Sequence, residues 1–169
     1  MYEMRVDGIN ALSMELHRQV RVYLNITGIM IYKLGNDIRN SAIDNIEENN
    51  QIGVSGMMKN SAVADYTTDG MTGEVGSKLL SPPYPLYQEK GTKPHFPPYK
   101  EWSSLWRWTM LKLGVPREEA EGVAFTIARA IAKNGTEAKP WLEPAYNVHA
   151  PGFEKSLLRK LKTELRKGN

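Results

Sequence analysis

Histidines are the natural place to look for chemistry in this chain, because it contains no cysteine. Without cysteine there is no disulfide, no thiolate metal ligand and no Cys–His nucleophile pair. His17, His95 and His149 lie far apart in the sequence, and none belongs to a His-Glu-x-x-His or similar ligand spacing. No Gly-x-Ser-x-Gly nucleophile elbow is present. We therefore expect surface histidines, no metal, no cofactor and no enzymatic activity.

A Gly-Thr phrase occurs twice and is the other candidate for chemistry. Gly91-Thr92-Lys-Pro94 looks like part of a phosphate loop, but it lacks the Gly-x-x-x-x-Gly-Lys-Ser/Thr spacing and runs into prolines. It reads instead as the end of a strand with a glycine turn and a stiff exit. The phrase returns in degraded form as Gly135-Thr-Glu-Ala-Lys-Pro-Trp141.

Aromatic residues cluster just after the first phrase. Trp102, Trp106 and Trp108, with Tyr99, could form a stacking platform for bases or sugars. Because Trp102 and Trp106 are four residues apart, a buried helical stripe or a subunit interface explains them as well. Trp108 lies off that stripe, and an exposed tryptophan favours an interface.

The C-terminal segment concentrates positive charge in a chain whose net charge is only +3. From Phe153 to Asn169 there are six Lys/Arg against two Glu. Such a segment could contact DNA or an acidic partner, or it could be a solvated helix face. The possible contact residues are Lys155, Arg159, Lys160, Lys162, Arg166 and Lys167.

A long helix over residues 10–48 must position whatever follows it. Its apolar residues recur at steps of three or four, which is the helical period. Gly28 and Gly35 weaken it, so a kink between Thr27 and Gly35 is allowed. A single apolar stripe on so long a helix needs a partner, either this domain's sheet or a neighbouring subunit.

A small, mainly antiparallel sheet is expected over residues 54–92. Asp69-Gly70 between two β-type runs is a strong hairpin signal, and the return strand should run over 71–76. A third strand is expected from Tyr84 to Lys90, with Pro85 at its start or on an edge. Residues 136–145 should form a fourth, extended rim strand.

Two further helical regions complete one α+β domain over residues 1–169. A helical hairpin is expected over 99–134, with Gly114 and Gly135 as stop signals, and a C-terminal helix over 151–167. No apolar run approaches the roughly 18 residues of a membrane span, and the N-terminus lacks the layout of a signal peptide. We therefore expect a protein made in the cytosol, with no membrane partner.

Four phrases in order resemble the neck, or head–tail joining, proteins of long-tailed bacteriophages, a family that includes minor tail and tail-completion proteins. The resemblance covers most of the chain and follows the N-terminal helix. The phrases are Ser55-Gly-Met-Met-Lys-Asn-Ser61, Tyr84-Pro-Leu-Tyr-Gln-Glu-Lys-Gly-Thr92, Pro94-His-Phe-Pro-Pro98 and Pro140-Trp-Leu-Glu-Pro-Ala145.

The resemblance implies a structural virion protein that forms a ring of six or twelve copies at the head–tail junction. Its partners would be other copies of itself, the connector or head-completion protein, and the tail terminator or tail tube protein. The ring would line or surround the DNA exit channel, and DNA contact would be sequence-independent. The protein would be found in the virion, and in the host cytoplasm during assembly.

The residues expected at the sheet rim and its contacts come largely from the matched phrases. They are Tyr84, Tyr87, Glu89, Gly91, Thr92, Pro94, His95, Phe96, Trp108, Pro140 and Trp141. Two other functions stay open from sequence. One is a nucleic-acid-binding module that uses the Trp-rich hairpin and the basic C-terminal helix, and the more remote one is a small hydrolase.

Overall fold

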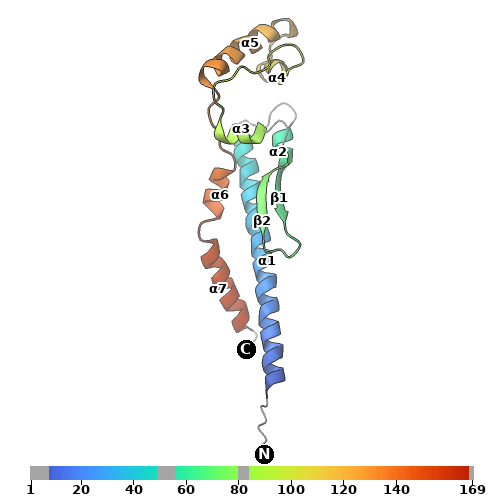
Figure 1. Cartoon of the computed structure of the whole chain (residues 1–169), viewed down its shortest axis with the longest axis vertical. Helices are drawn as coiled ribbons and strands as arrows, with labels where there is room; N and C mark the ends of the chain where they lie inside the picture. Colours follow the sequence, from blue (N-terminus) through green and yellow to red (C-terminus); the bar gives the residue numbers. More distant parts are fainter. Residues whose placement is uncertain (1–7, 49–55, 80–83, 168–169) are drawn as a thin grey trace, which may run out of the picture.

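The molecule is elongated and is organised along one helix (Figure 1). The computed structural model describes residues 8–48, 56–79 and 84–167. Helix α1, Ile9–Glu48, has 40 residues and is therefore roughly 60 Å long at 1.5 Å per residue. The prediction of a helix over 10–48 is confirmed, and α1 continues without a break through Gly28 and Gly35.

Two structural layers lie along α1 (Figure 1). One is a short helix, α2 (Met57–Ser61), leading into a hairpin of β1 (Ala62–Tyr66) and β2 (Gly73–Ser77). The strands are antiparallel, with Ala62 opposite Ser77 and Tyr66 opposite Gly73. The other layer is α6 (Glu143–His149) followed by α7 (Phe153–Arg166). The fold class is thus α+β, as predicted.

The β1–β2 hairpin confirms the Asp-Gly signal but has a longer loop than a two-residue turn. Asp69 closes the loop: its carboxylate accepts hydrogen bonds from the Thr67 hydroxyl at 2.6 Å and the Met71 amide at 2.9 Å. These bonds, with that of Thr67 first, lower the pKa of Asp69. Because they hold the chain from Thr67 to Thr72 in the loop, the return strand begins at Gly73 and not at residue 71.

The strand predicted from Tyr84 to Lys90 is wrong, because this segment is helix α3, Tyr84–Lys90. Pro85 belongs there for a different reason than expected: in a first helical turn its missing N–H has no partner to lose. The rim strand predicted over 136–145 is also wrong: residues 136–142 contribute only an isolated bridge at Thr136, and α6 begins at Glu143. Within the described residues the sheet is limited to β1 and β2; residues 54, 55 and 80–83 of the predicted sheet lie outside them.

A separate lobe is built from α4 (Ser104–Leu113) and α5 (Arg117–Asn134), which confirms the predicted helical hairpin. The Ser103 side chain caps α4 by accepting a hydrogen bond from the Trp106 amide at 3.2 Å, and Gly114 ends the helix in the left-handed conformation. A small core forms between the two helices. It contains Trp106, Ala120 and Ala124, with Tyr99, Leu105, Met110 and Val115 packed against it.

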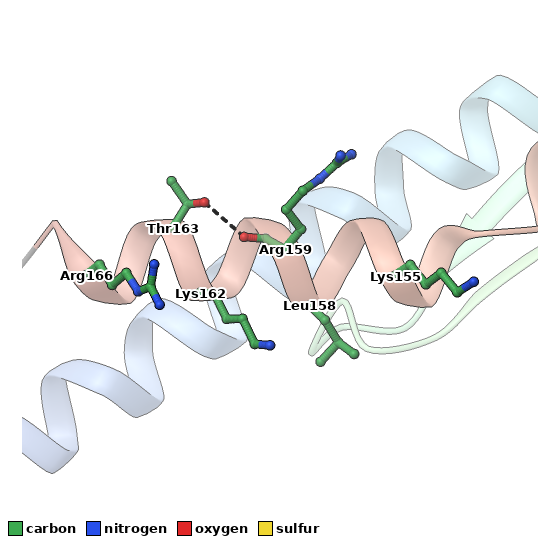
Figure 2. Close-up of a pocket in the computed structure, with 6 residues that line it drawn as sticks. All are labelled: Lys155, Leu158, Arg159, Lys162, Thr163 and Arg166. Carbon is green, nitrogen blue, oxygen red and sulfur yellow. Dashed lines mark hydrogen bonds between the residues drawn. The ribbon is translucent and has the colours of Figure 1, made fainter.

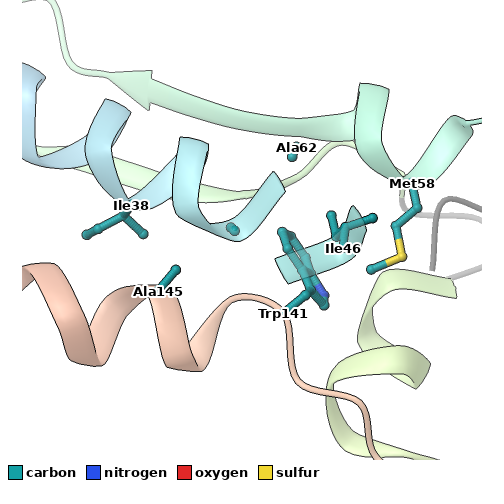
Figure 3. Packing of buried hydrophobic residues seen from close by; sticks show 7 residues of the cluster. Ile38, Ile46, Met58, Ala62, Trp141 and Ala145 are labelled. Atoms are coloured by element: carbon teal, nitrogen blue, oxygen red, sulfur yellow. The ribbon is translucent and has the colours of Figure 1, made fainter. Parts of the chain in front are cut away.

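The main core lies at the α3 end of α1, where α1, α2, β1 and α6 meet (Figure 3). Trp141 fills its centre and is 3% exposed. The buried cluster consists of Ile38, Ala42, Ile46, Met58, Ala62, Trp141 and Ala145. Nearby, Gly35 lets Tyr66 lie against α1, because a Cβ at position 35 would stand 2.5 Å from the tyrosine oxygen. A glycine that weakens α1 locally thus permits the hairpin to pack on it.

Candidate functional site: a joint and three exposed surfaces

The two Gly-Thr phrases pair with each other where the lobe joins the body. Thr92 and Thr136 form an antiparallel bridge, with N–H to O=C distances of 3.1 and 3.2 Å, and their hydroxyl oxygens lie 2.9 Å apart. Lys139 continues the pairing by donating its amide to the Gln88 carbonyl at 2.7 Å. We call the rest of the molecule the body and this paired region, around Thr92 and Thr136, the joint. Both chain segments that connect the lobe to the body pass through it.

Both glycines of the joint are required by conformation and by space. Gly91 has φ +67° and Gly135 has φ +72°, in the left-handed region that side chains disfavour. A Cβ on Gly91 would collide with the Thr136 carbonyl oxygen, and one on Gly135 with that of Thr92. The repeated phrase is thus explained by two backbones that approach closely across a local two-fold arrangement.

Glu89, at the end of α3, caps α6 from a distance in sequence. Its carboxylate accepts hydrogen bonds from the Trp141 amide at 2.7 Å, the Leu142 amide at 2.9 Å and the Glu143 amide at 2.9 Å. The Leu142 and Glu143 amides are the first two N–H groups of α6, which have no intrahelical partner, and the charge also suits the positive end of the helix dipole. Glu89 therefore locks α3 to α6.

Trp141 ties the joint to the core of the body. Its indole Nε1 donates to the Pro85 carbonyl at 3.0 Å, and its own carbonyl accepts from Asn45 of α1 at 2.9 Å. One helical turn further along α1, the Ser41 hydroxyl and His149 Nε2 are 2.7 Å apart. Both ends of α6 are thereby fixed to α1, and its start is fixed to α3 as well.

The structure divides the predicted rim residues into two groups. Glu89, Gly91, Thr92 and Trp141 form the joint, half-buried Pro140 precedes Trp141, and half-buried Tyr84 packs on the core. Burial raises the pKa of Tyr84. The remaining residues are exposed and are not brought together as one rim. They are Tyr87, Pro94, His95, Phe96 and Trp108.

Three joint residues were missed as site candidates: Gly135, Thr136 and Asn45. The first two carried a signal, because the second Gly-Thr phrase was visible in the sequence without being assigned a contact. Asn45 carried none, since a polar residue in a long helix is most often solvated.

The first exposed surface is the N-terminal part of α1, whose apolar stripe remains uncovered by the described residues. Every buried residue of α1 lies between Ile26 and Ile46. Before Ile26, large apolar side chains recur at steps of three or four and are 46–61% exposed. We call these residues the α1 stripe: Ile9, Leu12, Leu16, Val20 and Leu24.

The second exposed surface lies on the lobe. Trp102 precedes α4, is 72% exposed and has φ +71°, which is uncommon for a residue other than glycine. The Arg117 guanidinium stands over both Trp102 and Trp106, 5.6 and 5.8 Å from the ring centroids. Trp106 itself is 4% exposed. The alternative of a three-tryptophan platform is therefore not formed. Of the proposed buried stripe, Trp106 is buried but Trp102 is exposed, as is Trp108.

The third exposed surface is the basic side of α7 (Figure 2). The predicted helix over 151–167 is confirmed as Phe153–Arg166. The six basic residues of this segment, five in α7 and Lys167 directly after it, fall into two sets. Lys160 and Lys167 both form ion pairs with Glu164. The other four, Lys155, Arg159, Lys162 and Arg166, form no ion pair with any described residue.

The described residues contain no group of three or more His, Asp or Glu side chains that could hold a metal ion. Two of the histidines make local contacts: His17 Nδ1 lies 2.7 Å from the Ser13 carbonyl, and His95 Nδ1 lies 2.9 Å from that of Lys93. Among the helices described, none is long and apolar enough to cross a membrane.

No protein-family model, curated protein or solved structure matches this chain. Its function must therefore be argued from the surfaces and the joint themselves, together with the sequence phrases described above.

Proposed function

We propose that this protein is a structural subunit of a long-tailed bacteriophage, which forms a homo-oligomeric ring at the head–tail junction and joins the connector to the tail. The proposal rests on the resemblance of the four sequence phrases and on one structural observation. That observation is the α1 stripe, an apolar surface on a projecting helix that nothing in the described chain covers.

The α1 stripe has the character of a subunit contact. On a helix of 3.6 residues per turn, Ile9, Leu12, Leu16 and Val20 lie on the same face as the buried Ile38 and Ala42 further along. The half-buried positions of this part of α1 are largely polar, among them Glu15, Arg18 and Gln19. A contiguous exposed apolar stripe on a projecting helix is typical of a protein–protein contact.

The size of the stripe suits a ring better than a free dimer. Burying five half-exposed aliphatic side chains gains on the order of 5 kcal/mol, whereas association costs on the order of 4–15 kcal/mol. One such contact is therefore weak alone. Many copies held by a circular platform gain from effective concentration, so the ring is expected to close on the connector and the free subunit to stay monomeric.

The joint supports a subunit that contacts different partners at its two ends. The lobe carries the exposed Trp102 and Trp108 at one end of the molecule, and the α1 stripe occupies the other (Figure 1). Because Glu89, Trp141 and the paired Thr92 and Thr136 hold the lobe to the body, the spacing of the two surfaces is fixed. A fixed spacing is what a part between two coaxial rings requires.

Electron microscopy of lysates tests the proposal. Phage with the gene disrupted should yield DNA-filled heads and separate tails, and supplying the intact protein should restore joined particles. Leu12→Glu with Leu16→Glu should fail to restore them, whereas Asn25→Glu should restore them, since Asn25 lies on the opposite face of α1. Intact, infective virions from the disrupted phage would refute the joining role.

A further inference from the structure

We propose that α7 binds the phosphate backbone of double-stranded DNA through a row of four cations, without regard to base sequence. We call Lys155, Arg159, Lys162 and Arg166 the α7 row. The inference deepens the proposed function by naming the face of the subunit that meets DNA. It rests on that function only for the source of the DNA, because the row is complete in a single chain.

The four residues of the α7 row share one narrow face of the helix. Their spacings of four, three and four residues place them within an arc of roughly 60°, and the row is about 16 Å long. All four side chains are exposed. Figure 2 shows them along the helix, with α1 passing behind it.

The charges on α7 are sorted by face. Lys160 and Lys167 lie 3.3 and 2.9 Å from the Glu164 carboxylate, and their hydrogen bonds, that of Lys167 first, lower the pKa of Glu164. The single Glu164 carboxylate offsets one of their two positive charges. The α7 row faces away from Glu164 and keeps its charge for an external anion, so the site has four cations rather than the six that composition indicated.

The packing of α7 favours a nucleic acid over a membrane surface. A basic amphipathic helix binds a bilayer by burying its apolar face in it. In this structure Leu161 is 6% exposed, and Phe153, Leu157 and Leu165 are half-buried beside it. Since α7 packs on α1 (Figure 1), most of its apolar face is already covered, and Leu158, 49% exposed, is the large apolar side chain that remains open beside the basic residues.

The composition of the α7 row indicates what kind of nucleic acid it fits. A duplex presents one phosphate per 3.4 Å of axis on each strand, so a row of about 16 Å faces four or five of them. Arginine and lysine suit phosphate oxygens. The row contains no aromatic residue to stack on single-stranded bases and no Asn or Gln to read base edges. Sequence-independent duplex binding follows.

Fluorescence anisotropy with a labelled mixed-sequence duplex of about 30 base pairs tests the inference on the purified full chain. Four phosphate contacts predict a slope of log affinity against log salt of about −3 to −4 between about 50 and 200 mM salt. Lys162→Ala with Arg166→Ala should weaken binding at least tenfold at low salt and make the slope shallower by about two.

A matched control distinguishes binding by the α7 row from binding that depends only on the net charge of the protein. Lys160→Ala with Lys167→Ala removes the same two charges from the same helix and should leave the slope unchanged. Equal weakening by both double variants would overturn the inference. So would tighter binding to phosphatidylserine vesicles than to the duplex, or full displacement of the duplex by polyglutamate at equal charge.

The outcomes also distinguish this inference from the proposed function. If the Lys162/Arg166 variant loses duplex binding while disrupted phage shows no joining defect, the α7 row stands and the joining role fails. If heads and tails stay apart in the disrupted phage but the purified chain gives no salt-dependent duplex binding, the joining role stands and the α7 row fails.

Discussion

The two halves of α1 carry the same apolar periodicity and meet opposite surroundings. In the half from Ile26 to Glu48, Ile38, Ala42 and Ile46 are at most 4% exposed and form the core with Trp141 and Met58. In the half from Ile9 to Asn25, the residues of the same stripe are about half exposed. One pattern thus serves as a core in one place and as an open surface in the other.

The difference shows where the fold receives its stability. The joint, α6 and the hairpin all attach to the half of α1 that contains the core, through Trp141, Asn45, His149 and Tyr66. The other half continues a well-anchored helix, since helix propagation is easier than nucleation, and α7 lies along its other side (Figure 1). Its apolar residues are therefore available for a partner without cost to the fold.

The largest difference in stability is expected when an aliphatic side chain is truncated to alanine in each half of α1. Ile46→Ala removes a fully buried side chain and should cost about 3–4 kcal/mol of unfolding free energy. Leu16→Ala removes one that is 52% exposed and should change stability by less than about 0.5 kcal/mol. Urea unfolding of the two variants measures both values. Similar costs would mean that the α1 stripe is covered within the monomer.

A glycine series tests whether the joint belongs to the rigid part. Gly91→Ala should cost roughly 3 kcal/mol, because it adds backbone strain and a collision with the Thr136 carbonyl. Gly114→Ala adds a Cβ in open space at positive φ and should cost about 1 kcal/mol. Gly122→Ala, inside α5 with nothing nearby, should stabilise by up to about 1 kcal/mol. Calorimetry of the three should give this order; a neutral Gly91→Ala would contradict the paired joint.

Removal of the cap between α3 and α6 should have a slightly smaller effect. Glu89→Ala leaves three amides without their acceptor and should cost about 2–3 kcal/mol. Glu137→Ala makes the same chemical change at an exposed site near the joint and should be nearly neutral. Hydrogen exchange of the Leu142 and Glu143 amides should accelerate in the first variant only. Unchanged exchange in Glu89→Ala would show that the cap is not formed in solution.

The smallest predicted change in stability in this comparison concerns Thr27, at the boundary between the two halves of α1. The Thr27 side chain is buried, and its hydroxyl has no hydrogen-bond partner among the described residues. Thr27→Val keeps the shape and removes the unsatisfied group, so it should stabilise the fold by about 1 kcal/mol. Destabilisation in thermal unfolding would instead reveal a hydrogen bond at this site and move the boundary toward the N-terminus.

The sequence predicted most of the helical architecture, because the helices are marked by start and stop residues and by apolar periodicity. Gly114 ends α4, Pro116 precedes α5, and the apolar period of residues 10–48 gives α1 to within one residue. It failed at Tyr84–Lys90, where a short aromatic run fits a strand or a helix and only the contacts of Pro85 and Glu89 with Trp141 select the helix.

The candidate site was predictable only in part, for a physical reason. The Gly-Thr repeat was visible, but its pairing is a contact between residues 44 positions apart, and no local rule gives such a distance. The basic residues of α7 were all named, yet the separation of the α7 row from Lys160 and Lys167 depends on where Glu164 points. Helical period identified the apolar stripe of α1 without revealing which half is covered.

The central claim is that the α1 stripe is a contact between subunits, and the absence of cysteine allows a direct test in the assembled particle. Leu16→Cys places a thiol on the stripe, and Asn25→Cys places one on the opposite face. Maleimide labelling should proceed at similar rates at both positions in the free protein. In purified virions we predict that labelling at position 16 slows at least tenfold while labelling at position 25 does not. Equal rates at the two positions in virions would contradict the claim.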